Sequence, residues 1–146
     1  MWTFFGKYPI GVFAAAFLAV AAGCRSDRPA TIPVSGRITF DGEAPPAAGT
    51  LYFTIDAPAD GFPRRPTLAK FDERGRFRVT TWDRGDGLVP GRYKVRVECW
   101  EIPPELGGTE GKSYVPAKYQ CPTTTDLVVE IAPDDRSRTL ELNLAR

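Results

Sequence analysis

Three cysteines and no histidine define the side-chain chemistry available to this chain of 146 residues. Histidine is the base of Ser-His-Asp and Cys-His sites, the commonest general acid–base residue and a frequent zinc ligand. Its absence excludes these sites in their usual form. The cysteines at positions 24, 99 and 121 show no CxxC spacing, which argues against a catalytic thiol. We therefore expect no enzymatic activity, no catalytic residues, no metal and no cofactor.

Cys24 follows a segment with the properties of a secretory leader. Residues 1–23 carry one charge, Lys7, and then an uninterrupted apolar run from Ile10 to Ala22. This run is shorter than the roughly 20 residues that a helix needs to span a bilayer. The exit, Val20-Ala-Ala-Gly-Cys24, resembles the lipobox of bacterial lipoproteins, in which signal peptidase II cleaves before an acylated cysteine. The resemblance implies a signal peptide over 1–23 and lipidation of Cys24. The alternative is an ordinary leader that leaves Cys24 unmodified.

The lipobox also implies an address for the mature chain. Several acyl chains hold a protein stably on a membrane, where a single chain would be marginal. Arg25 follows the cysteine where aspartate would favour retention in the inner membrane, so the family analogy favours the outer membrane. Residues 24–31 are polar and include Pro29, which predicts a short tether. We expect a lipid-anchored protein of the cell envelope, on its periplasmic or external face.

The other two cysteines can pair with each other. If Cys24 is acylated, Cys99 and Cys121 remain as an even pair in an oxidising compartment, which favours a disulfide. In the chain-entropy model, a disulfide that closes a loop of this size stabilises the folded protein by about 3 kcal/mol. Two separate buried thiols are the alternative, because cysteine packs as a small apolar residue.

Carboxylates offer two weaker possibilities. Asp83 and Asp86 flank Gly85 at a turn, but a tight calcium site takes six or more oxygen ligands, so a solvated loop is expected. A carboxylate-only hydrolase would need two facing acids and a pocket, and the sequence predicts no pocket. It is the least favoured function. The acids available for it are Glu98, Glu101, Glu105 and Asp126.

Four aromatic residues lie in or beside expected loops. Exposed aromatic rings can stack on sugars or contact a protein, so these residues are the candidate ligand contacts. The competing interpretation is that they cap the ends of the core and cover sheet edges. The four residues are Trp82, Trp100, Tyr114 and Tyr119.

The charge balance bears on partners. The chain has 19 Lys and Arg against 18 Asp and Glu, and removal of the leader with Lys7 leaves equal numbers. A neutral chain with interleaved signs lacks the basic footprint of a nucleic-acid-binding protein. Basic residues do alternate along two expected strands, where Glu98 and neighbouring acids should offset them. They are Arg76 and Arg78 on one strand and Arg92, Lys94 and Arg96 on the other.

Seven segments alternate apolar and polar residues, the pattern of strands with one buried face. Turn signals such as Asp72–Gly75 and Pro90-Gly91 separate them, and the chain contains 14 Gly and 14 Pro. We expect one all-β domain over residues 32–146, a seven-stranded antiparallel β-sandwich, with a closed barrel as the alternative. The expected strands cover 34–40, 50–55, 67–71, 76–81, 92–99, 127–131 and 139–144.

Three of these segments are similar to the repeating signatures of carboxypeptidase-regulatory-like domains. They are Val34–Gly42, Phe71–Phe77 and Pro90–Val95. The resemblance implies a transthyretin-like (prealbumin-like) or immunoglobulin-like sandwich. The order of lipobox, sandwich and Val115–Tyr119 before the last two strands resembles small lipoproteins of planctomycete bacteria. That resemblance implies a fold and an address, but no activity.

Together these patterns predict a lipid-anchored envelope module that binds or supports other molecules without catalysis. Its partners would be the membrane and an envelope protein or polysaccharide, contacted through the loops over 56–66 and 100–125. The alternative is a carbohydrate-binding module that presents Trp82 and Trp100.

Overall fold

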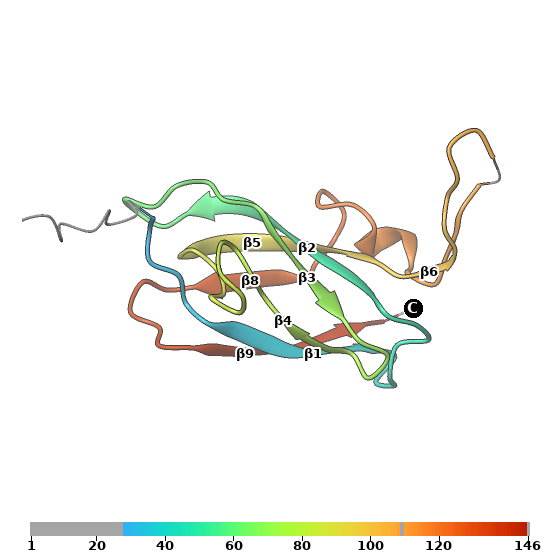
Figure 1. Ribbon diagram of the computed structural model, residues 1–146, viewed down its shortest axis with the longest axis horizontal. Coiled ribbons are helices and arrows are strands. Elements are labelled where there is room, and N and C mark those ends of the chain that lie inside the picture. Colours follow the sequence, from blue (N-terminus) through green and yellow to red (C-terminus); the bar gives the residue numbers. More distant parts are fainter. Residues whose placement is uncertain (1–27, 109, 146) are drawn as a thin grey trace, which may run out of the picture.

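The computed structural model describes residues 28–108 and 110–145, and its regular elements are almost all β-strands (Figure 1). The all-β class and the seven expected strands are confirmed. One sheet contains β1 (Val34–Phe40), β2 (Gly49–Pro58), β3 (Thr67–Phe71), β4 (Arg76–Arg78), β5 (Gly91–Glu98), β8 (Val128–Ile131) and β9 (Arg138–Leu144). The segment between β5 and β8 adds a hairpin that the sequence pattern did not predict, followed by a single 3-10 turn. These elements are β6 (Trp100–Ile102), β7 (Lys112–Ser113) and η1 (Ala117–Tyr119).

The seven-stranded sheet has the order β8-β5-β2-β3-β4-β1-β9 and is mixed. The expectation of purely antiparallel pairing is wrong for β1 and β9, which run parallel over all seven residues of each. Alternation of apolar residues marks the buried face of a strand but is the same for either direction of its neighbour. Gly36 permits the close approach, because a Cβ there would lie 2.1 Å from the carbonyl oxygen of Leu140.

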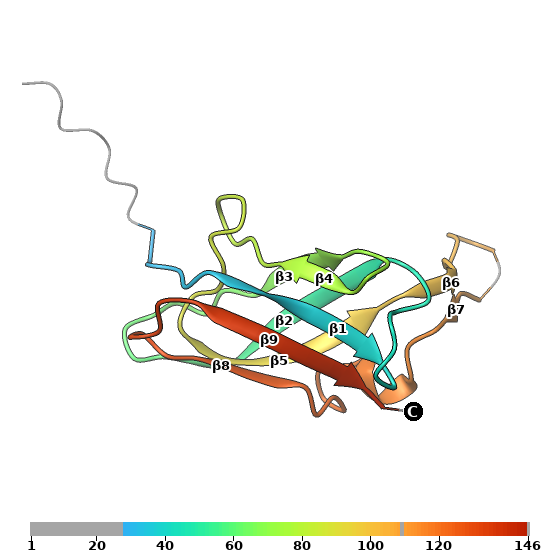
Figure 2. The same ribbon diagram turned by 90° about the horizontal axis from the view of Figure 1, so that it is seen from below.

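The sheet curls so that its two halves face each other around one core (Figure 2). Phe53 on β2 lies 6.5 Å from the ring of Phe77 on β4, although β3 separates these strands in the sheet. Tyr93 on β5 packs edge-on against Phe53 at 6.4 Å. Burial raises the pKa of Tyr93 to about 12, and its hydroxyl donates to the carbonyl of Val89 at 2.7 Å. Inward-facing residues of all seven strands thus share one apolar interior.

The two ends of the curled sheet carry different loops. At one end, residues 28–33 enter β1 beside the loop over 79–90, and Ile32 and Leu88 exchange two backbone hydrogen bonds of 2.8 and 2.9 Å. The β6–β7 hairpin extends from the opposite end (Figures 1 and 2). Residues 1–27, with the expected leader and the lipobox cysteine, lie outside the described part. Within 28–108 and 110–145, no helix has the length and apolarity needed to cross a bilayer.

Candidate functional site

Cations gather on the outer face of β3 and β4, under the loop that joins β4 to β5. They surround an open hollow with a volume of about 590 Å³. Lys70 on β3 and Arg76 and Arg78 on β4 point outward because their neighbours Ala69, Phe71 and Phe77 fill the core. We call this hollow the basic groove; it is lined by Lys70, Asp72, Arg76, Phe77, Arg78, Thr80, Arg84 and Gly85.

Only one of the four cations in the basic groove is neutralised. Arg76 forms an ion pair of 2.8 Å with Asp72. Backbone N–H groups of Arg76 and Arg74, together with this guanidinium, hold the pKa of Asp72 below its usual value. Lys70, Arg78 and Arg84 form no ion pair with any residue that the structure describes. The hollow therefore carries four cations against one carboxylate, Asp72, which is paired with Arg76.

A tightly bonded turn holds Arg84 over the groove. The carboxylate of Asp86 accepts hydrogen bonds from the backbone N–H groups of Thr81 (2.7 Å), Trp82 (3.0 Å) and Asp83 (3.0 Å). Burial alone would raise the pKa of Asp86, but these three donors outweigh it and the pKa lies below its usual value. The carboxylate therefore stabilises the turn at neutral pH. That stabilisation is lost as the pH falls through the lowered pKa of the folded protein.

The same bonds engage Asp86, the residue considered for a calcium site, within its own turn. Its two oxygens are occupied by backbone donors, and Gly85 donates to the hydroxyl of Thr80 at 3.0 Å, which closes the turn. Among residues 28–108 and 110–145 there is no group of three or more His, Cys, Asp or Glu placed to hold a metal ion.

The basic groove continues in both directions across the sheet. A hollow of about 350 Å³ shares Arg78 and Gly85 with it and adds Arg138 and the hydroxyls of Ser35 and Thr139. On the other side a hollow of about 340 Å³ shares Thr80. The lining is thus mainly cationic and hydroxylic, suited to anionic oxygen atoms.

The structure separates the two sets of alternating basic residues, because β2 and β3 lie between β4 and β5. On β5 the acids offset the charge as expected. Arg92 lies 3.6 Å from Asp56 and 3.7 Å from Glu130, and Arg96 pairs with Glu98 at 2.6 Å. On β4, Arg78 forms no ion pair with any described residue. The expectation of a neutralised face therefore does not hold for Arg78.

Sequence reasoning missed Lys70 and Arg84 as members of this site. Lys70 lies in phase with the outward residues of β3, and the Asp72–Gly75 turn that joins β3 to β4 is the signal that could have placed it beside Arg76 and Arg78. Arg84 lies in a loop, where periodicity gives no direction. A partial signal was present in Arg76 and Arg78, which do alternate outward.

Trp82 and Trp100 do not form one aromatic face. Both side chains are half-buried, but Trp82 lies in the loop before β5 and Trp100 begins β6, so that the eight residues of β5 lie between them. Arg65 lies over the Trp82 ring at 5.6 Å. A sugar that stacked on one of these rings could not reach the other.

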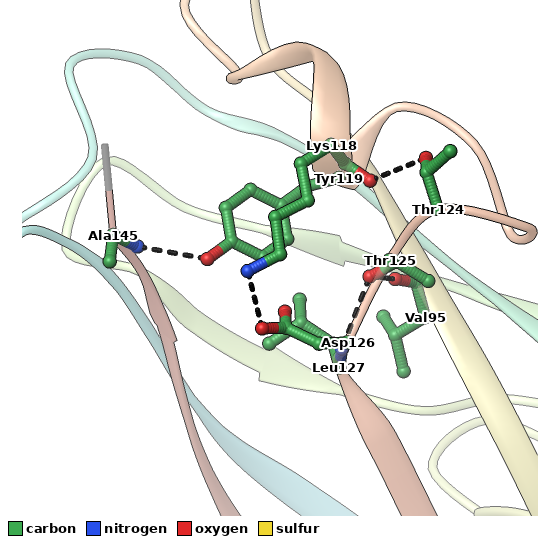
Figure 3. A network of polar contacts seen from close by, with 8 residues as sticks. All are labelled: Val95, Lys118, Tyr119, Thr124, Thr125, Asp126, Leu127 and Ala145. Carbon is green, nitrogen blue, oxygen red and sulfur yellow. Dashed lines mark hydrogen bonds and ion pairs between the residues drawn. The ribbon is translucent and has the colours of Figure 1, made fainter.

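Tyr119 and Tyr114 pack on the protein itself. Tyr119 is 2% exposed, and its hydroxyl accepts the N–H of Ala145 at 3.1 Å (Figure 3). Tyr119 is therefore not available as a ligand contact, which corrects that hypothesis. Tyr114 is half-buried against the core, and its N–H donates to the carbonyl of Cys99. The 114–119 segment covers the sheet, as the competing interpretation proposed.

Three of the four candidate carboxylates for hydrolysis are bonded to cations or a phenol. Glu98 accepts from Arg96 and from the hydroxyl of Tyr52, the latter at 2.9 Å. Glu101 pairs with Lys112 at 2.9 Å, and Asp126 pairs with Lys118. Glu105 lies exposed in the loop after β6.

Cys99 and Cys121 are both free thiols in this structure, so the expected disulfide is not formed. Cys99 continues the inward side of β5, is fully buried and donates to the carbonyl of Ala47 at 3.3 Å. Cys121 lies on the surface with its sulfur 3.0 Å from the hydroxyl of Thr123. The side chain of Cys99 points into the core because the alternation of β5 continues through residue 99. Cys121 lies on the surface, so the two sulfurs are on different sides of the core boundary.

The two thiols should differ strongly in reactivity. Burial raises the pKa of Cys99, whereas hydrogen bonds from Thr123 lower the pKa of Cys121. We expect an aromatic disulfide reagent to modify Cys121 at least about 100-fold faster than Cys99, since a buried thiol reacts only through unfolding. Peptide mass spectrometry after timed labelling measures both rates, and labelling in urea should make them equal. A native chain in which neither site reacts until a reductant is added would instead reveal the disulfide.

No protein-family model, no curated protein and no solved structure matches this chain. Its function must therefore be argued from the site.

Proposed function

We propose that this protein is a non-catalytic binding module of a bacterial cell envelope, anchored by lipid on Cys24, whose ligand-contact surface is the basic groove. The anchor rests on the lipobox resemblance of residues 20–24. The observation that carries the binding function is the set of three cations, Lys70, Arg78 and Arg84, that line one hollow and form no ion pair among the described residues. Such a set favours an anionic ligand, because an anion in the hollow would supply the charge partner that none of the three side chains has in an ion pair.

The fold within this proposal is a two-layer prealbumin-like sandwich of the carboxypeptidase-regulatory-like type. The contact of Phe53 with Phe77 across β3 shows that the sheet is strongly curved, which both a sandwich and the alternative barrel require. In the proposed sandwich, β2, β5 and β8 would form one layer and β4, β1 and β9 the other, which agrees with their order in the sheet. The sheet fixes the backbone positions from which Lys70 and Arg78 reach the groove.

Charge reversal in the groove tests the binding function. Electrophoresis of the native protein through gels that contain dextran sulfate should show retardation, and Arg78→Glu/Arg84→Glu should weaken it about tenfold or more. Arg92→Glu/Lys94→Glu changes the net charge equally on β5 and should leave most of the retardation. Equal loss in the two double variants would mean that net charge alone decides, and would contradict a site at the groove.

The same gels separate this proposal from the carbohydrate-binding alternative. A module that stacks sugars on Trp82 or Trp100 should bind a neutral glucan, and Trp82→Ala or Trp100→Ala should abolish that binding. The separation of the two indoles by the eight residues of β5 disfavours this alternative. An anionic ligand bound through the groove predicts no retardation by neutral dextran.

A further inference from the structure

We propose that the basic groove binds the anionic headgroups of the membrane that carries the lipid anchor, so that the domain docks on that membrane. This inference deepens the function proposed above and rests on acylation of Cys24. Its structural basis is that the chain enters the domain beside the groove, at the turn that presents Arg84.

The path of residues 28–33 places the groove near the anchor. Arg28 contacts the carboxylate of Asp83 at 3.4 Å, and Ile32 pairs with Leu88 in the same loop. Arg28 lies four positions after Cys24 in the sequence, and a fully extended chain of four residue steps spans at most about 14 Å. The Arg84 end of the basic groove must therefore lie close to an acylated residue 24. The β6–β7 hairpin lies at the other end of the sheet.

The charges of the groove fit a membrane surface. The acyl chains of Cys24 would already hold the protein on the membrane, so cations of the groove would act on how the domain lies against it; each Lys or Arg near an anionic surface favours that contact. Lys70, Arg78 and Arg84 lie on one open face rather than in a deep pocket, so several phosphate groups can approach them together. The hydroxyls of Ser35 and Thr139 in the adjoining hollow can donate to the same oxygens.

Lysine footprinting of the lipidated protein tests this docking. The protein extracted from membranes is reconstituted in vesicles of phosphatidylcholine alone, or of an equal mixture with phosphatidylglycerol, and acetylated with a water-soluble ester. Lys70 should be labelled about fivefold or more slowly on the anionic vesicles. Lys112 on the distant hairpin should be labelled equally on both and serves as an internal control. High salt should restore the labelling of Lys70.

Variants separate docking from general charge attraction. Arg78→Glu/Arg84→Glu should restore the labelling of Lys70 on anionic vesicles, and the matched Arg92→Glu/Lys94→Glu should not. Equal labelling of Lys70 on both vesicles, with the diacylglyceryl mass present on Cys24, overturns the docking and leaves the anchored module intact. Protection by soluble dextran sulfate but not by phosphatidylglycerol also overturns it, in favour of an acidic glycan. A Cys24 peptide without lipid overturns the proposed anchor and the docking with it.

Discussion

Replacing Gly87 by alanine should destabilise the protein by about 3 kcal/mol, among the largest effects of any single methyl group in this chain. Gly87 has a φ of +95°, and an added Cβ would lie 1.7 Å from the carbonyl oxygen of Ile32. The methyl group must therefore separate the loop before β5 from the segment that enters β1. Those are the two segments that join the tether to the groove. Urea unfolding followed by tryptophan fluorescence measures the loss.

Gly61→Ala is the matched control for this substitution. Gly61 also has a left-handed φ, +80°, but nothing lies within 4 Å of its added Cβ. The free energy of unfolding of the Gly61→Ala variant should fall by only about 1 kcal/mol, the cost of a left-handed backbone conformation for a residue with a side chain. The difference between the two variants isolates the collision with Ile32. Equal losses would show that the loop is free to move away from residues 28–33.

The strands of this fold were predictable because each carries its own local signal. Val95 and Val97 alternate with charged residues on β5, and glycine and proline interrupt the chain between strands, as at Pro90-Gly91. The parallel pairing of β1 with β9 was not predictable, because it depends on how the chain returns from β8. Nor was the β6–β7 hairpin, whose strands are only three and two residues long and are separated by prolines and glycines.

Only two of the four cations of the basic groove were recognised from the sequence pattern, for a related reason. The alternation of Arg76 and Arg78 correctly indicated two outward cations. Whether acids neutralise them depends on which strands are neighbours, and this is a property of the sheet order. Asp56 and Glu130 lie beside Arg92 because β2 and β8 flank β5. On β4, Arg76 pairs with Asp72 from its own turn, and Arg78 has no acid beside it in an ion pair among the described residues.

Replacing Thr125 by valine should cost about 2–4 kcal/mol, although the two side chains have nearly the same shape. Thr125 is 5% exposed, and its hydroxyl donates to the carbonyl of Val95 at 2.8 Å and accepts the N–H of Leu127 at 3.2 Å (Figure 3). Valine removes the partner of the buried Val95 carbonyl and that of the part-buried Leu127 N–H. The bonds lie where the chain enters β8, so we expect the ladder between β5 and β8 to weaken first, measurable by amide exchange of Val129.

Thr124→Val tests whether burial is the cause. The neighbouring hydroxyl also donates to a backbone carbonyl, that of Lys118 at 2.8 Å, but Thr124 is exposed and water can replace the lost bond (Figure 3). It should lose at most about 1 kcal/mol. Thr125→Ser keeps the buried hydroxyl and removes one methyl group, so it should retain most of the stability. If Thr124→Val and Thr125→Val were equally costly, desolvation of Val95 and Leu127 could not be the reason. The hydrogen bonds of the Thr125 hydroxyl would then contribute no more than those of an exposed threonine, and the stability of β8 would come from its apolar side chains.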